Sequence, residues 1–475
     1  MERRIWLGYA DKSCKQPIWY NGESHGLIDL RTRGGKGSCY LIPIGLTYEG
    51  SMMVNDPKGQ WLAVCGRYRR DVLGQKIYVL NPYKILQKYL GQFFHATYDP
   101  VTSQMDPNSE TFAADADNVF EGLIPNDGKD PHWPESARLF GSGISMHLRR
   151  SMNCWSLAAA YLAICSSGLY QFCEDEINQL RDDLIAGEVD ETIEEIIHRL
   201  SRFGGERARE NREIQSVVSH AITKLGWLSN KPISRNMQES TVDFARMKHE
   251  PMTVVLVSPA RYLRTCNAWT RTMINAWADA MLREEPGEFP VLGLLDEFPT
   301  SVGNLSSVET LSALGAGFGC QLITVVQNLN QLAKLMPNGW ETWLGNTGFQ
   351  LHGAPGAGDM FTSKHISAMC GMVEVESLSR SISERKWTPQ LGGGMIGALN
   401  GLTSSLASGD QISIGQIMKP YLSPEAIREL GDDEALAWVE GIKGVIRSGR
   451  RPYYRDPHFA GKYDPDPYHT KKGPS

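Results

Sequence analysis

The chain has 475 residues, enough to bury large hydrophobic cores, and we expect two or three domains. Its formal net charge of −6 excludes a global polycation, so any contact with DNA must come from local basic patches. The nine cysteines lack C-x-x-C or C-x-x-H spacing, which favours a reducing compartment and argues against structural zinc. The residues before Trp6 do not form a signal-peptide pattern, and the apolar stretch Trp155 to Ile164 is too short to span a bilayer.

Residues 1 to about 28 are expected to form short strands and turns that lead into a glycine-rich loop at residues 30–38. Its glycines let backbone N–H groups converge on an anion without a Cβ in the way. Lys36 adds a positive charge for the β- and γ-phosphates, and a helix expected from about Ser38 to Leu46 adds its dipole. The pattern therefore predicts a phosphate-binding loop made of Thr32, Arg33, Gly34, Gly35, Lys36, Gly37 and Ser38.

This loop fits the P-loop pattern G-x-x-x-x-G-K-[ST] only in part. Leu30 stands where the first glycine is expected, and Gly37 stands where the magnesium-binding hydroxyl is expected. Taken alone, Gly-Gly-Lys-Gly is also typical of a plain turn. The nucleotide-binding interpretation therefore depends on segments further along the chain.

The next segment predicts alternating strands and helices. A buried strand is expected at residues 51–56, a helix at residues 61–68 and a strand at residues 76–80, with the sharp turn Asp56-Pro57-Lys58-Gly59 after the first strand. Strands that alternate with helices predict a parallel sheet covered on both faces. We assign residues 1–98 to the first part of a nucleotide-binding domain.

Residues 99–240 show helical periodicity without a convincing strand, which predicts an all-α domain inserted into the sheet domain. An acid-rich stretch from Glu174 to Glu195 is followed by an arginine-rich stretch from Arg199 to Arg212. Such runs are usually solvated helix faces. Subunit contacts or substrate capture are the alternative roles for this reversal of charge.

The chain is expected to return to the sheet near residue 241, with a strand at residues 253–257 and a long amphipathic helix after it. The apolar run Val291 to Leu295 predicts a buried parallel strand that ends in Asp296 and Glu297. In P-loop ATPases the acid that ends this strand faces the magnesium, and the glutamate after it polarises the attacking water. The alternative is that the two acids merely open a solvated loop.

A third buried strand is predicted at residues 319–326, directly before Gln327. An amide at this tip can sense the γ-phosphate or hold the attacking water, although polar residues that end strands are common. His352, in another expected strand, is interpreted as a satisfied polar group, because no second His or Cys stands at metal-binding spacing.

Residues 241–475 are assigned to the second part of the nucleotide-binding domain. Their Ser- and Gly-rich stretch 377–413 predicts a flexible loop or hairpin. A helix is expected to start at Ser423 with Pro at its first position, and a short hairpin is expected between residues 435 and 447. Residues 456–475 are interpreted as a tail.

Together these segments resemble the type IV secretion coupling proteins, the TraG/TraD-like P-loop ATPases of conjugation and effector export. In that family Gly commonly follows the lysine of the loop, whereas Leu30 remains a departure. The resemblance covers nearly the whole chain in the expected order, and it rests on residues 32–37, 54–59, 80–82, 132–138, 295–299, 326–328 and 344–346.

The resemblance implies an α/β, RecA-like P-loop ATPase with a mostly parallel central sheet and an inserted all-α domain. It implies ATP and Mg²⁺ as cofactors, with Lys36, Glu297 and Gln327 as catalytic residues and Asp296 at the metal. A homo-hexameric ring should recruit single- or double-stranded DNA with a relaxase, or effector proteins, and deliver them to a type IV secretion channel. An arginine finger from the next subunit is expected, and its candidates are Arg380, Arg385, Arg447, Arg450 and Arg451.

Coupling proteins usually carry an N-terminal membrane anchor, and this chain begins about where such an anchor would end. We therefore expect a cytoplasmic protein at the inner membrane of a bacterium, without a transmembrane segment in this chain, the anchor being either removed or naturally absent. A second hypothesis is a cargo receptor or docking platform with little or no ATP turnover, which Leu30 and the missing hydroxyl at position 37 favour. A monomeric P-loop kinase is disfavoured, because an acid pair on a late strand and a large helical insertion suit ring motors better.

Overall fold

Two compact units make up the computed structural model, which describes residues 3–126, 130–151, 156–186, 190–303, 305–381 and 411–469. The larger unit comprises Met1–Pro355 and Leu430–Ser475, and the smaller unit comprises Gly356–Glu429. All three segments that the sequence assigns to nucleotide binding lie in the larger unit.

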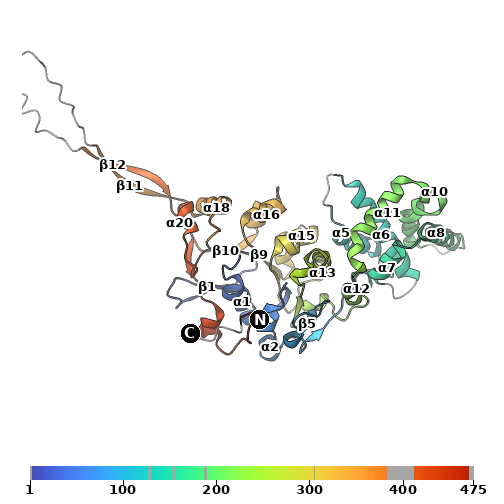
Figure 1. Cartoon of the computed structure of the whole chain (residues 1–475), viewed down its shortest axis with the longest axis horizontal. Helices are drawn as coiled ribbons and strands as arrows, with labels where there is room; N and C mark the ends of the chain where they lie inside the picture. Colours follow the sequence, from blue (N-terminus) through green and yellow to red (C-terminus); the bar gives the residue numbers. More distant parts are fainter. Residues whose placement is uncertain are drawn as a thin grey trace, which may run out of the picture. The chain divides into compact units, whose positions relative to one another are not determined.

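A sheet of twelve strands, counted over the described residues, is the centre of the larger unit, and several of its strands are labelled in Figure 1. The strand order is β2-β1-β14-β13-β10-β3-β9-β8-β4-β7-β5-β6. Strands β10 to β6 of this order pair in parallel, while β13, β14, β1 and β2 pair antiparallel beside them. The mostly parallel sheet of the sequence prediction is thereby confirmed. The strands are β1 (Ile5–Tyr9), β2 (Pro17–Tyr20), β3 (His25–Asp29), β4 (Ser51–Asn55), β5 (Lys76–Leu80), β6 (Phe94–His95), β7 (Met252–Leu256), β8 (Val291–Leu295), β9 (Cys320–Val326), β10 (Thr347–His352), β13 (Glu434–Val439) and β14 (Ile446–Gly449).

Both faces of the parallel strands are buried. Leu27 of β3 belongs to one hydrophobic core and its neighbour Ile28 to another, and Met53 and Val54 of β4 divide in the same way. A strand that is buried on both faces needs apolar side chains at successive positions, not at alternate ones. This is why these strands are visible in the sequence as short, continuous apolar runs.

Helices cover the sheet, and those after residue 99 form a further group that shares a hydrophobic core with it. The loop at residues 30–38 continues into a π-helical turn (Gly37–Leu41) and then α1. The other helices of the larger unit follow in chain order, with two 3-10 turns near the C-terminus. They are α1 (Ile42–Thr47), α2 (Gln60–Asp71), α3 (Gln87–Leu90), α4 (Pro100–Gln104), α5 (Phe112–Leu123), α6 (His132–Ser151), α7 (Leu157–Ile164), α8 (Leu169–Ile185), α9 (Glu191–Leu200), α10 (Gly205–Glu210), α11 (Arg212–Leu225), α12 (Lys231–Asn236), α13 (Leu263–Arg283), α14 (Phe298–Ser301), α15 (Ser306–Leu314), α16 (Leu329–Leu335), α17 (Trp340–Gly345), η7 (Tyr453–Arg455) and η8 (Pro457–Phe459).

The helical stretch after residue 99 agrees with the sequence prediction in its secondary structure. Helices α5, α6, α7, α8, α10 and α11 lie together in Figure 1, and no strand occurs among the described residues between α4 and α12. Their hydrophobic core is continuous with one face of the sheet, since Phe120 and Phe140 belong to the same core as Leu27 and Trp277. That residues 99–240 form a domain of their own therefore stays a prediction.

The chain enters and leaves this helical stretch at neighbouring points. Thr241 donates its backbone N–H to the carbonyl of Thr97 (3.0 Å), and Asp99 donates its N–H to the Ser240 hydroxyl (2.9 Å). The carboxylate of Asp99 accepts backbone N–H groups at the starts of α4 and α7, from Thr102 (3.0 Å) and Leu157 (2.8 Å). Burial raises the pKa of Asp99 to about 7. One buried acid thus joins two helix starts to the edge of the sheet.

The C-terminal residues are packed on the larger unit, contrary to the prediction of a tail. Residues 456–469, interpreted as a tail, are packed on the larger unit: Phe459 is buried, and Asp464 donates its N–H to the carbonyl of Val64 in α2 (3.0 Å). Arg67 of α2 also pairs with the Asp464 carboxylate (2.7 Å). The tail prediction is therefore wrong up to residue 469, because aromatic anchors fix a segment whose Pro- and Asp-rich composition is typical of a loop.

The smaller unit contains α18 (Met360–Cys370), α20 (Pro424–Arg428) and the strands β11 (Met372–Ser381) and β12 (Gln411–Pro420), which pair antiparallel. The two ends of the Ser- and Gly-rich stretch 377–413 are therefore strand, as in a hairpin, and residues 382–410 lie outside the described residues. Ser423 accepts the N–H of Ala426 (3.2 Å), which confirms the expected start of a capped helix.

Candidate functional site

The carboxyl ends of four neighbouring parallel strands bring the expected site residues together. The glycine-rich loop follows β3, Gln327 follows β9, the pair Asp296 and Glu297 follows β8, and Asp56 follows β4. These strands stand in the order β3-β9-β8-β4, so consecutive members of the set are on adjacent strands. In open parallel sheets, ligands bind at the carboxyl ends of the strands. Residues from four distant parts of the sequence therefore meet at one place.

The loop turns away from the sheet after Leu30. The backbone N–H of Leu30 still bonds to the carbonyl of Val326 in β9 (3.2 Å), and the turn closes from Gly34 N–H to the carbonyl of Arg31 (2.9 Å). Gly35 has φ +84°, in the left-handed region that favours glycine. Its carbonyl accepts the N–H of Cys39 (2.8 Å). The first turn of the following helix leaves N–H groups without an intrahelical acceptor, as an anion site requires.

The same geometry explains the departure at position 30. The side chain of Leu30 is 1% exposed, and a Cβ placed on Gly353 would lie only 2.8 Å from its Cδ2 atom. Leu30 is therefore still a core residue of the sheet, packed against Gly353 directly after the neighbouring strand β10. Because the turn begins after it, this position does not need the conformational freedom of glycine.

Lys36 is at the centre of a polar network. Its ammonium group donates to Oε1 of Glu297 and lies 3.1 Å from Oδ1 of Asp296. Gln327 donates its amide N–H to Oε2 of Glu297 (2.7 Å), and Thr32 donates its hydroxyl to Oε1 of Gln327 (2.9 Å). The structure thus brings these five sequence-predicted site residues into one connected network.

Glu297 and Asp296 are held by the turn that follows β8. Glu297 has φ +54°, an uncommon conformation for a residue other than glycine, and such conformations cluster at functional sites. The backbone N–H of Glu297 donates to Oδ1 of Asp296 (2.9 Å). Asn55, at the end of β4, donates to the backbone carbonyl of Asp296 (2.7 Å) and to the hydroxyl of Ser301 (2.8 Å). Neighbouring strands therefore fix the position of both acids.

Burial and charge act on the titrating groups of the site. Burial alone would lower the pKa of Lys36, but the charges of Asp296 and Glu297 outweigh it and raise that pKa, so the ammonium stays protonated. Burial raises the pKa of Asp296, although the charge of Lys36 opposes this. Burial also raises the pKa of Asp56 to about 7, and the nearby charge of Asp296 adds to the effect. Perturbed titrating groups of this kind cluster in functional sites.

A cavity of about 620 Å³ lies over this network, and cavities of this size hold small ligands and cofactors. The sequence predicted its loop residues and acids but missed its other wall. The missed residues come from the turn after β4, the start of α2 and the C-terminal segment, and include Asp56, Gln60, Trp61, Tyr453, Tyr454, Asp466 and His469. The turn Asp56-Pro57-Lys58-Gly59 is visible in the sequence, whereas nothing local marks the C-terminal residues.

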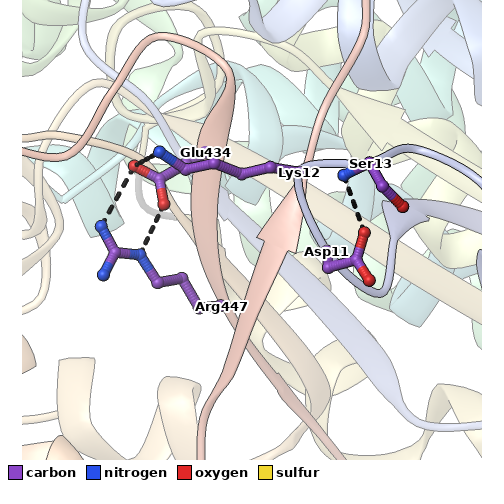
Figure 2. A pocket seen from close by; sticks show the side chains of 5 residues that line it. All are labelled: Asp11, Lys12, Ser13, Glu434 and Arg447. Atoms are coloured by element: carbon purple, nitrogen blue, oxygen red, sulfur yellow. Dashed lines mark hydrogen bonds and ion pairs between the residues drawn. The ribbon is translucent and has the colours of Figure 1, made fainter.

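Two candidates for the arginine finger have partners within their own chain. Arg450, just after β14, is 4% exposed and donates to the backbone carbonyl of Gly34 in the loop. Arg447 pairs with Glu434, which also accepts Lys12 (2.9 Å), as Figure 2 shows. We therefore withdraw Arg450 as a finger that reaches a neighbouring subunit, because its guanidinium is buried against its own loop.

The other candidates remain predictions. The guanidinium of Arg451 lies 6.0 Å from the centre of the Tyr9 ring. Arg385 lies outside the described residues, and Arg380 lies in β11, where its surroundings are not described. In the pocket of Figure 2, Glu434 has its pKa held at about 2, where hydrogen bonds from Arg447 and Lys12 overcome the opposite effect of burial. This ion-pair cluster stabilises the β13–β14 hairpin, from which Arg450 follows.

The donor set at Asp296 suits magnesium held together with phosphates. Among the described residues, no three His, Cys, Asp or Glu side chains converge to hold a metal ion. Mg²⁺ is usually held by one or two carboxylates, several waters and the phosphates of a substrate, not by a complete protein cage. The residues present therefore fit Mg²⁺ as part of a nucleotide complex.

Residues 6–473 of the chain match the family model described as Type IV secretory system Conjugative DNA transfer. The chain belongs to this family. Two curated relatives are the conjugal transfer protein TraG of Escherichia coli, 22% identical with 96% of this chain and 71% of TraG covered, and VirD4 of Rhizobium radiobacter, 24% identical with 94% and 60% covered. The type IV secretion system-coupling protein VirD4 of Bartonella henselae is 24% identical, with 91% of this chain and 63% of VirD4 covered. The chain thus spans less than two thirds of either VirD4.

Solved structures of the conjugative coupling protein TrwB share the fold. One without bound ligand, TrwBdeltaN70, has a TM-score of 0.62 at 15% identity, covering 95% of this chain and 91% of that chain. TrwB in complex with ADP and Mg²⁺ has a TM-score of 0.59 at 16% identity, covering 92% and 88%. The likeness confirms the α/β fold with its mostly parallel sheet and helical region. Within the described residues, no helix combines the length and the hydropathy that crossing a bilayer requires.

Proposed function

We propose that this coupling protein hydrolyses ATP and uses the energy to deliver substrates to a type IV secretion channel. The observation that carries the proposal is the network that joins Lys36 to Asp296, Glu297 and Gln327 below a cavity lined by the glycine-rich loop. A cation and loop amides for phosphate, an acid for magnesium and an acid for water are the parts that phosphoryl transfer to water needs.

Each side chain has a role that follows from its chemistry. Lys36 and the loop amides hold the β- and γ-phosphates, since an ammonium group and free N–H groups both favour anions. Glu297 accepts a proton from the attacking water, and Gln327 holds Glu297 in place and senses the γ-phosphate through its amide. Thr32 fixes the orientation of that amide by donating to its oxygen.

ATP and Mg²⁺ are the proposed cofactors. The TrwB structures in complex with ADP and Mg²⁺ and with a non-hydrolysable ATP analogue support this choice for a protein of the same fold. Asp296 would hold the metal, which supplies positive charge to the phosphates when it is bound. The raised pKa of Lys36 keeps it cationic in the pH range where the phosphates are anionic.

The family to which the chain belongs suggests its assembly and its partners. The protein would act as a homo-hexameric ring at the cytoplasmic face of the inner membrane, with an arginine finger supplied by the next subunit. DNA with its relaxase, or effector proteins, would be its cargo, and components of the secretion channel its partners. Because the net charge is negative, binding to DNA should rest on local basic patches and weaken as salt is added.

Removing the ammonium group tests the nucleotide site. Lys36→Ala should abolish ATP binding and leave the fold intact, since the Lys36 side chain contributes a polar network and not a part of the hydrophobic cores. Lys334→Ala, at an exposed residue of α16 that does not line the cavity, is the matched control. Fluorescence titration with a labelled ATP, on variants with parental circular dichroism, measures the effect. An unchanged affinity in Lys36→Ala would contradict the assignment of the loop.

A docking platform that binds cargo but hardly hydrolyses ATP is the second candidate. Gly37 favours it, because the hydroxyl that usually binds magnesium is missing at this position. The two functions differ in turnover by the assembled protein. Release of phosphate that is stimulated by DNA and lost in Lys36→Ala supports the motor, whereas binding of ATP without release supports the platform.

A further inference from the structure

The C-terminal segment, defined here as residues 453–469, is built into the wall of the cavity. Tyr453, Tyr454, Asp466 and His469 line the same cavity as Lys36. This segment follows β14, more than four hundred residues after the glycine-rich loop, and the proposed reaction has no role for it.

The segment is fastened to α2 and to the turn before it. Gln60 donates to Oδ2 of Asp466 (2.6 Å), and the hydroxyl of Tyr468 donates to the backbone carbonyl of Lys58 (3.0 Å). The N–H of Asp464 bonds to Val64, and its carboxylate accepts Arg67. Several independent bonds therefore hold this wall in place.

An aromatic core anchors the other end of the segment. Phe459 is buried and makes an edge-to-face contact with Trp6 (ring centroids 5.1 Å apart), and Tyr453 packs against Tyr463 (4.7 Å). Tyr454 differs from these residues, because 52% of it is exposed although it lines the cavity. Its ring makes an edge contact with Tyr453 (ring centroids 5.3 Å apart) and has the guanidinium of Arg455 over one face (5.9 Å from the ring centre). The opposite face is the one on which a planar ligand can stack.

The charges of the cavity orient a nucleotide. Phosphates are favoured at the ammonium of Lys36 and disfavoured at the carboxylate of Asp466. Within the described part of the chain, this carboxylate accepts hydrogen bonds from the neutral amide of Gln60 and the backbone N–H of Tyr468, not from a cation. A carboxylate is an acceptor for hydroxyl and amino hydrogens, which the ribose and the base of a nucleotide carry. The base can stack on an aromatic ring, as bases do in many nucleic-acid-binding proteins.

We infer that the C-terminal segment is the nucleoside-binding wall of the cavity, with the base stacked on Tyr454 and the ribose or base donating to Asp466. The inference rests on the proposed function, because it assumes that the ligand of the cavity is a nucleoside triphosphate. It assigns to the end of the chain the part of the affinity that distinguishes a nucleotide from bare phosphates. Lys36 and the loop then recognise the phosphates alone.

Comparing ATP with inorganic tripolyphosphate, both with Mg²⁺, separates the two halves of the site. Tyr454→Ala should weaken ATP binding about tenfold, a loss typical of one stacked base, and should leave tripolyphosphate binding unchanged. Tyr454→Phe keeps the ring and should bind ATP like the parent. Lys36→Ala should weaken both ligands. Tyr421→Ala, at a tyrosine that is 54% exposed and does not line the cavity, is the matched control.

Isothermal titration of each folded variant distinguishes the outcomes. Equal ATP affinities for the parent and Tyr454→Ala would overturn the inference and leave the proposed function standing. A Tyr454→Ala variant that loses tripolyphosphate as well as ATP would also overturn it, because the ring would then act on the whole site. A parent that binds neither ligand would overturn the inference together with the proposed function. Asp466→Asn, which keeps the shape of the side chain, should lower ATP affinity by a smaller factor and spare tripolyphosphate.

Discussion

Glu297→Gln is the substitution that separates binding from chemistry most sharply. Glu297 accepts a hydrogen bond from Lys36 on one carboxylate oxygen and from Gln327 on the other, so both of its oxygens take part in the network. Glutamine has nearly the same shape and keeps one carbonyl oxygen for these donors. It has no negative charge, however, and cannot take a proton from water at neutral pH.

The expected loss of turnover is about 10²- to 10⁴-fold, the usual contribution of general acid–base catalysis. This corresponds to about 3–5 kcal/mol of the activation free energy, since each tenfold change in rate is about 1.4 kcal/mol. ATP affinity should be unchanged or higher. Lys36 would have only Asp296, at 3.1 Å, as a charged competitor of the phosphates instead of two carboxylates.

Phosphate release by the assembled protein, measured together with ATP affinity, checks both expectations. Glu440→Gln is a suitable control, because Glu440 also accepts a hydrogen bond, from Tyr20 (2.9 Å), but does not line the cavity. Near-parental turnover in Glu297→Gln would refute its role as the base. Loss of ATP binding in this variant would instead show that its charge is needed to position Lys36.

Three further substitutions test the surroundings of the site. Arg450→Met should weaken ATP binding by roughly tenfold in a titration, because the carbonyl of Gly34 loses its buried donor, whereas Arg451→Met should not. Arg69→Met should lower the free energy of unfolding in urea by about 3 kcal/mol or more, since several buried carbonyls lose a donor; a loss below about 1 kcal/mol would count against this. Asp99→Asn should flatten the pH dependence of stability. Because the pKa of Asp99 is raised from 3.8 to about 7 in the folded chain, the folded chain binds more protons than the unfolded chain. The free energy of unfolding of the parent should therefore fall by about 4 kcal/mol as pH rises through this window. If urea unfolding gave the same change in the free energy of unfolding between pH 5 and pH 8 for parent and variant, that account would be contradicted.

The sequence was informative where local pattern decides structure. Buried parallel strands need consecutive apolar residues, so β4, β7, β8 and β9 were predictable within a residue or two. The loop around Lys36 and the acids after β8 were recognisable because the phosphate binding and water activation proposed for them need particular residue types at strand ends. The network among them was predictable as a set, since neighbouring parallel strands end at one edge of the sheet.

Residues that act through distant contacts could not be predicted in this way. Arg450 and Gly34 are bonded although they are 416 residues apart, and the Asp466 contact with Gln60 spans 406 residues. Nothing in the local pattern around residues 456–469 distinguishes a packed segment from a tail. The role of Arg69 could not be predicted either, because a charged residue in an amphipathic helix usually lies on the solvated face. In the structure Arg69 is fully buried and donates to backbone carbonyls.

The two departures from the P-loop pattern lie where they would disturb the proposed phosphate binding least, and this favours the motor over the docking platform. Leu30 is still paired with β9, so the turn begins one residue later and the cradle is formed by Arg31 to Gly35 and the helix start. Gly37 lacks a hydroxyl, but Ser38 follows it, lines the cavity and donates only to the carbonyl of Gly35 (3.3 Å) among oxygen acceptors in the described residues. A long bond of this kind is weak and easily exchanged. The cation, the amide cradle, the two acids and a hydroxyl are therefore all present at the carboxyl edge of the sheet, although the pattern that usually announces them is incomplete.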